Sequence, residues 1–154
     1  MKKIILSLVF AVSAIAFANA QENAIGLKFG YGADISYQRN LGSSNRLEFN
    51  LNLDGFDGNS FGLQGLYQWV WDLDQLAQGF KWYAGVGAGL GTWRAADKDN
   101  RAFALAVLGN IGIEYNFNIP LQLALDWTPG VRIIPSGDGR FGYEGIKLAI
   151  RYKF

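Results

Sequence analysis

The chain of 154 residues is 50% hydrophobic and 15% aromatic, with 20 glycines, 3 prolines, no cysteine, no histidine and a formal net charge of +1. Charges of both signs are spread along it, which excludes a basic tract for nucleic acid and a basic helix for a membrane surface, and the length suits one domain. Since disulfides are excluded, the stability of a secreted form must come from hydrogen bonding, packing or the surrounding solvent.

The N-terminal residues have the three parts of a secretory signal peptide. Lys2 and Lys3 are basic, residues 4–18 form an apolar run, and Ala20 ends a small-residue cleavage site just before Glu22. A membrane anchor is the alternative, but a spanning helix needs roughly 20 apolar residues and this run is shorter. We therefore predict a signal peptide over 1–20 and a mature domain over 21–154, in which no later run could form a spanning helix.

The mature chain alternates apolar and polar residues, which is the pattern of strands with two unlike faces. The alternation is strictest between Arg46 and Asp54. Seven segments show it clearly: 33–41, 46–54, 61–71, 80–93, 103–115, 121–128 and 146–154. Turn-forming residues separate them at 42–45, 55–60, 72–79, 95–100, 116–120 and 135–140.

An eighth strand is expected over 24–29, because bacterial single-chain barrels have an even strand number. A connection over 30–32 would pair Phe29 with Ala33 and Leu27 with Ile35, so the apolar faces match across the hairpin. If residues 24–39 form one long strand instead, the count is seven. The sequence leaves this choice open.

The apolar faces of these strands are expected to point outward. An eight-stranded barrel has no room inside for five tryptophans and many large aliphatic residues. A soluble sandwich or lipocalin-like barrel would leave the polar strand faces unexplained. We predict an all-β fold: a transmembrane antiparallel up-and-down β-barrel of eight strands, closed because unpaired backbone groups are costly in lipid.

Aromatic residues fall near the ends of the predicted strands, as membrane interfaces favour. One rim would carry Tyr37, Trp69, Trp71, Phe80, Trp82, Tyr115, Phe117, Tyr152 and Phe154. The other would carry Phe56, Phe61, Trp93, Phe103, Phe141 and Tyr143.

The last predicted strand has apolar residues at alternate positions up to a terminal phenylalanine: Ile146, Leu148, Ile150, Tyr152 and Phe154. This pattern resembles the C-terminal assembly signal of Gram-negative outer-membrane proteins. The resemblance implies pairing of this strand with an edge strand of the barrel-insertion machinery during assembly.

The mature chain as a whole resembles the small eight-stranded outer-membrane barrels of the outer membrane protein A and X type. Residues 112–120 and 126–129 are similar to uncharacterised outer-membrane barrels. The resemblance implies a monomer surrounded by outer-membrane lipid in a Gram-negative bacterium. It implies no activity, and the short loops depart from the adhesive members of the family.

Opposite charges from several strands share the predicted inward face: Lys28, Asp34, Arg46, Glu48, Glu114, Asp126, Lys147 and Arg151. Buried charges must be paired, and eight strands leave an interior that side chains fill, so we expect a salt-bridged network that closes the lumen. An ion path is the alternative.

A row of inward glycines at 85, 87, 89 and 91 has two interpretations. It makes room for long partners such as Tyr83 or Arg151. It could instead open a slot, with Leu66, Val70 and Leu108 lining a small apolar site.

Catalysis and metal binding find little support in the composition. Enzymatic outer-membrane barrels resemble one another in relying on a catalytic histidine, which this chain lacks, and the mature serines at 36, 43, 44, 60 and 136 have no imidazole to activate them. Asp54 with Asp57, or Asp97 with Asp99, could bind Ca²⁺ weakly, but solvated loops are the simpler interpretation. We expect no enzyme, no cofactor, no metal site and no nucleic-acid partner.

By elimination, the sequence predicts a structural or envelope-maintaining outer-membrane barrel. A narrow pore for ions or small solutes is the first alternative. Surface binding through loops such as 95–100 or 135–140 is the second.

Overall fold

The computed structural model describes residues 23–30, 32–42, 44–53, 61–94, 101–133 and 140–154, of which 92–94, 101–102 and 140–144 are described by their backbone alone. The expected signal peptide over 1–20 lies outside these residues, as do most of the connections at one end of the molecule. Among the residues described, no helix is long and apolar enough to cross a membrane.

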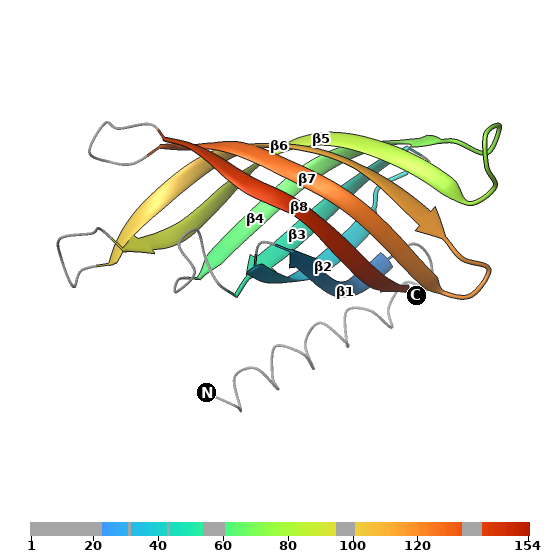
Figure 1. Cartoon of the computed structure of the whole chain (residues 1–154), viewed down its shortest axis with the longest axis horizontal. Helices are drawn as coiled ribbons and strands as arrows, with labels where there is room; N and C mark the ends of the chain where they lie inside the picture. The colour runs from blue at the N-terminus through green and yellow to red at the C-terminus, as the bar shows by residue number, and fades with distance from the viewer. Residues whose placement is uncertain (1–22, 31, 43, 54–60, 95–100, 134–139) are drawn as a thin grey trace, which may run out of the picture.

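Eight strands follow one another around a closed barrel (Figure 1). They are β1 (Asn23–Gly30), β2 (Gly32–Asn40), β3 (Asn45–Asn52), β4 (Gly62–Asp72), β5 (Phe80–Arg94), β6 (Arg101–Asn116), β7 (Leu121–Ile133) and β8 (Arg140–Lys153). Each pairs antiparallel with its neighbours, and β1 pairs with β8 to close the ring. The predicted antiparallel up-and-down barrel of eight strands is confirmed.

The choice left open for residues 24–39 is settled in favour of two strands. Phe29 is opposite Ala33 and Leu27 is opposite Ile35, in the expected register. The tight connection depends on Gly32, whose φ of 90° lies in a region that residues with a Cβ rarely adopt.

The polarity of the barrel is inverted relative to a water-soluble protein. On β1 the outward Leu27 and Phe29 are 45% and 46% exposed, whereas Lys28 between them is 1% exposed. The same alternation continues around the ring, so the buried side chains are mostly polar and the exposed ones mostly apolar. The predicted orientation of the two faces is therefore confirmed.

The two ends of the barrel differ. The terminal end, as we call it, holds Asn23, Phe154 and the turns that follow Asn40, Asp72 and Asn116. There, the backbone N–H of Asn23 donates to Phe154 O at 3.1 Å. At the opposite, far end, the strands stop at different heights (Figure 1). Strands β1–β3, here called the short wall, have 8 or 9 residues. Strands β5–β8, the tall wall, have 13 to 16.

Two tall-wall strands are longer than the sequence pattern predicts. Strand β7 continues past Thr128 to Ile133, and β8 begins at Arg140 rather than near Ile146. The two extensions pair with each other beyond a bulge that adds one residue to β8 between Glu144 and Lys147. The bulge shifts the alternation by one position, so the extension does not continue the pattern of the rest of β8.

Candidate functional site: the charged lumen

The lumen collects all eight charged side chains that the sequence analysis assigns to the inward face. They come from six strands, β1–β3 and β6–β8, and the period of two turns each one toward the barrel axis. Every one of them is 4% exposed or less. Four are cations and four are anions, so the interior is formally neutral: Lys28, Arg46, Lys147 and Arg151 against Asp34, Glu48, Glu114 and Asp126.

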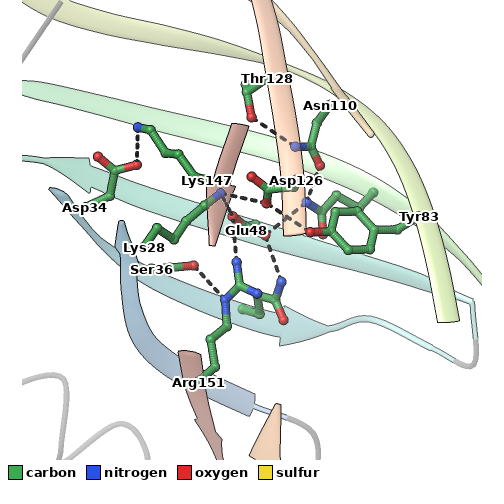
Figure 2. A network of polar contacts seen from close by, with 12 residues as sticks. Lys28, Asp34, Ser36, Glu48, Tyr83, Asn110, Asp126, Thr128, Lys147 and Arg151 are labelled. Atoms are coloured by element: carbon green, nitrogen blue, oxygen red, sulfur yellow. Dashed lines mark hydrogen bonds and ion pairs between the residues drawn. The ribbon is translucent and has the colours of Figure 1, made fainter. Parts of the chain in front are cut away.

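Glu48 is the centre of the network (Figure 2). Its Oε1 accepts hydrogen bonds from Lys28 Nζ at 3.0 Å and Arg151 Nη2 at 3.2 Å. Its Oε2 accepts from Gln38 Nε2 at 2.7 Å and Gln68 Nε2 at 2.9 Å. Four donors match the about four lone-pair directions of a carboxylate, so Glu48 is fully satisfied without solvent.

Asp126 forms a second centre on the opposite wall. Its Oδ2 accepts from Lys28 Nζ at 2.8 Å and from the Tyr83 hydroxyl at 2.9 Å. Lys28 therefore bridges two carboxylates, and a single ammonium links β1 with β3 and β7 across the lumen. Such cross-links fix the strands that contribute them and obstruct the axis.

Two further ion pairs lie beside this centre. Lys147 Nζ lies 2.6 Å from Asp34 Oδ2, and Arg46 Nη1 lies 2.7 Å from Glu114 Oε2. The Arg46 guanidinium also stacks over the Tyr83 ring, 4.5 Å from its centroid. Each cation of the lumen thus has at least one carboxylate partner, as burial requires.

Neutral side chains complete the network, a role that was not predicted for them. Gln68 accepts from Arg46 Nε at 2.6 Å and donates to Asn110 Oδ1 at 2.7 Å. Ser36 Oγ accepts from Arg151 Nε at 2.9 Å, and Gln122 Oε1 accepts from Arg151 Nη1 at 3.2 Å. They occupy the same inward positions as the charges, so the alternation itself was the signal that could have identified them.

A few buried polar atoms have no hydrogen-bond partner among the residues described. Both amide atoms of Asn50 are in this state, as are Asn52 Oδ1, Asp126 Oδ1 and Arg46 Nη2. Asn50 is 1% exposed. Buried groups of this kind in native proteins commonly bind ordered water.

At Gly85, Gly87 and Gly89, the glycine row on β5 does not form the slot that one interpretation allowed. A Cβ at Gly85 or Gly87 would collide with the backbone of β4, so these glycines permit the two strands to approach closely. The space beside Gly89 is occupied by Leu108 and Gln64. The glycine that makes room for Tyr83 is Gly112 on β6, which the sequence analysis did not name for this role.

The candidate apolar residues are also packed. Leu66 and Leu108 form a small buried cluster with Ala106, and Val70 packs against a second cluster that contains Tyr83.

Aromatic rings gather on the barrel exterior at the terminal end. Trp71 and Trp82 stack with their centroids 4.3 Å apart. Phe80 on β5 contacts Tyr115 on β6, and further ring contacts join Tyr115 to Phe117 and Tyr152 to Phe154. Of the six aromatics expected at the other rim, the described side chains are Phe61 and Phe103, which are 56% and 71% exposed.

Most of the carboxylates and serines weighed above as alternative sites lie outside the described part of the chain. Within that part, no group of three or more metal-ligating acidic, histidine or cysteine residues occurs. Asp54, Asp57, Asp97 and Asp99 lie outside it, as do the serines at 43, 60 and 136. Ser36 serves as a hydrogen-bond acceptor for Arg151.

Comparison with known proteins finds no matching family model, no matching curated protein and no matching solved structure. Any functional assignment therefore depends on the sequence and the geometry described above.

Proposed function

We propose that this protein is a non-enzymatic integral outer-membrane barrel of a Gram-negative bacterium, with a lumen closed by its own side chains and a structural or envelope-maintaining role. The observation that carries the proposal is the inverted polarity. Large apolar side chains face outward on every strand, and ion-paired side chains fill the interior.

The exterior supports a hydrocarbon environment. A monomer in water rarely exposes a continuous apolar surface larger than a few hundred Å², and here such residues encircle the barrel. A closed barrel pairs the backbone groups of its strands internally, which is the condition for spanning a bilayer with strands. The aromatic rings at the terminal end suit the headgroup region on one side of that bilayer.

The interior supports a closed lumen rather than an open channel. Lys28, Glu48, Asp126 and Arg151 join strands on opposite sides of the barrel at hydrogen-bond distance. An eight-stranded interior is narrow enough for side chains to fill, and these side chains meet at its centre.

A narrow pore is the second candidate, and one observation favours it. The unpartnered atoms at Arg46, Asn50 and Asp126 would accommodate water inside the lumen. Surface binding through the far-end loops stays a prediction, since those loops lie outside the described residues.

Further parts of the proposal follow from the sequence. They are a signal peptide over 1–20, a monomeric state, resemblance to the outer membrane protein A and X type, and recognition of the 146–154 strand by the insertion machinery. Ile146, Leu148, Ile150 and Tyr152 are exposed on the exterior of β8, where an assembly partner could contact them.

Single-channel recording on refolded protein in a planar bilayer tests the closed lumen. Folding is first verified by heat-modifiable gel mobility and strand content. We expect a silent bilayer from the folded wild type and discrete steps after Glu48→Ala with Arg151→Ala, which removes two side chains from the centre. Discrete conductance steps from the wild type would favour the narrow pore over the closed lumen.

A further inference from the structure

The two walls of the barrel differ in height. The inference drawn from this difference rests on the proposed membrane location and concerns the thickness of the surrounding bilayer. A transmembrane strand tilted by about 45° needs about 9 to 11 residues to span a bilayer. The short-wall strands β1 and β3 have 8 residues, at or below this limit, and the tall-wall strands β5 and β6 have 15 and 16, well above it.

The seam between the two walls shows where the short wall ends. Strand β1 pairs with β8 from Ala24 opposite Lys153 to Phe29 opposite Leu148. Beyond this point β8 continues to Arg140 and pairs with β7 alone among the residues described. An unpaired strand edge is not tolerated in hydrocarbon, because its backbone N–H and C=O groups have no partner there. Gly30 still lies against the backbone of Ile146 and Lys147, so it is the edge at 140–145 that belongs above the hydrocarbon.

The opposite side of the barrel requires hydrocarbon at the same height. On that side, outward apolar side chains continue along β5 and β6 beyond the level of the short wall: Leu90, Phe103, Leu105 and Val107. All are at least 45% exposed, and Val107 and Phe103 reach 59% and 71%. If the far-end leaflet had one height around the whole barrel and kept the β8 edge out of the hydrocarbon, this apolar surface would be exposed to water.

Tilting the whole barrel would relieve the conflict at the far end but create one at the terminal end. There, the outward face carries Tyr115 on the tall wall, whose ring packs against Phe80, and the exposed Arg39 on the short wall. Aromatic and basic side chains are the residues that anchor a protein at the interface. Their presence on both walls fixes the barrel upright.

We propose that the bilayer around this barrel is uneven: its far-end leaflet is thinned beside β1–β3 and the edge of β8 that no described strand pairs, and it keeps its full height beside β5 and β6. The partner of this surface is lipid whose local thickness follows the wall. Hydrophobic mismatch of this kind is accommodated by local thinning at modest cost per Å.

Site-directed spin labelling tests the proposal cleanly, because the chain has no cysteine. Phe29→Cys and Val107→Cys place labels near the far end of the short and tall walls, and Arg39→Cys with Tyr115→Cys place labels at the terminal end. The register aligns Phe29 with Ile113 through β8 and β7, and Val107 lies six residues beyond Ile113 on β6. Strand tilt introduces an offset of about four residues over three strands. The separation of six residues is larger than this offset, so Val107 is farther from the terminal end than Phe29 is.

Label depth is read in folded protein in vesicles from collision with oxygen, which concentrates in lipid, and with a water-soluble nickel complex. We expect the label at Val107 to be more lipid-exposed than the label at Phe29, although Val107 is nearer the far end of the barrel. We expect the labels at Arg39 and Tyr115 to lie at equal depths. The pair Ile35→Cys and Leu105→Cys repeats the comparison if either first variant fails to fold.

Other outcomes overturn the inference in distinct ways. A deeper label at Phe29 than at Val107 means a flat leaflet. If Val107 is more lipid-exposed than Phe29 but the labels at Arg39 and Tyr115 lie at different depths, the barrel is tilted. If the nickel complex reaches all four labels, the protein is not inserted in the bilayer. This result would refute the proposed function as well as the uneven bilayer.

Discussion

Arg151 and Glu48 lie 103 positions apart in the chain, and their side chains meet inside the barrel with Nη2 3.2 Å from Oε1. Both are completely buried. The contact joins β8 to β3 across the lumen, so it links two strands that are not neighbours in the ring. Its energetic consequences can be measured by removing either partner.

Replacement of Glu48 by alanine should be among the most destabilising single changes in the chain. It leaves Lys28 and Arg151 without the carboxylate they share. Breaking a buried ion pair by removing one partner costs about 3–5 kcal/mol. Urea titration of protein folded in vesicles measures the loss. In the double variant with Arg151→Ala, the two effects should not add, and strict additivity would show that the pair is uncoupled.

Leu125→Arg should report which face of β7 contacts lipid. Leu125 is 47% exposed on the exterior near the middle of the strand, and an arginine there costs about 2–4 kcal/mol if it faces the bilayer midplane. Leu121→Arg is the matched control in the same strand at the terminal end, where about 0–1 kcal/mol is expected. Equal effects at the two positions in a folding titration would contradict a depth-dependent lipid environment.

Asn50→Leu tests whether the lumen is dry. If the unpartnered amide of Asn50 has no water, an apolar residue of similar size should be neutral or slightly stabilising. Gln68→Leu is the control, because Gln68 bonds to Arg46, Glu48 and Asn110, and its loss should cost about 1–3 kcal/mol. Comparable destabilisation in both variants would indicate ordered water at Asn50 and favour the pore.

Gly87→Ala should destabilise the β4–β5 pairing. The added methyl group would collide with the backbone of Gly65, and overpacking of this kind costs about 1–3 kcal/mol. Gly42→Ala, in a turn where an added Cβ meets nothing within 4 Å, should leave the unfolding midpoint unchanged. A tolerated alanine at 87 would mean that β4 and β5 are farther apart than described.

The alternation of side chains made the architecture predictable from the sequence. Leu27, Phe29 and Ile35 identify a hairpin whose register the structure reproduces, and the apolar face of each strand points outward as expected. A period of two carries this information because it fixes the face of every residue in a strand once one residue is placed.

Three features could not be predicted. The β7–β8 extension was hidden by Pro129 and Gly130, which resemble turn residues, and by the bulge before Lys147. The role of Gln68 depends on which strands face each other across the ring. The glycines at 85 and 87 serve strand contact, which depends on distances between backbones that no single strand encodes.

The central claim is that the apolar exterior is immersed in lipid, and the tryptophans allow the most direct test. Trp69, Trp71 and Trp127 lie on the exterior and are 39–43% exposed. Folded protein in vesicles of brominated phospholipid should lose most of its tryptophan fluorescence relative to unbrominated vesicles, with little quenching by aqueous iodide. Unquenched fluorescence in brominated lipid from a folded barrel that remains in the aqueous fraction would contradict the account.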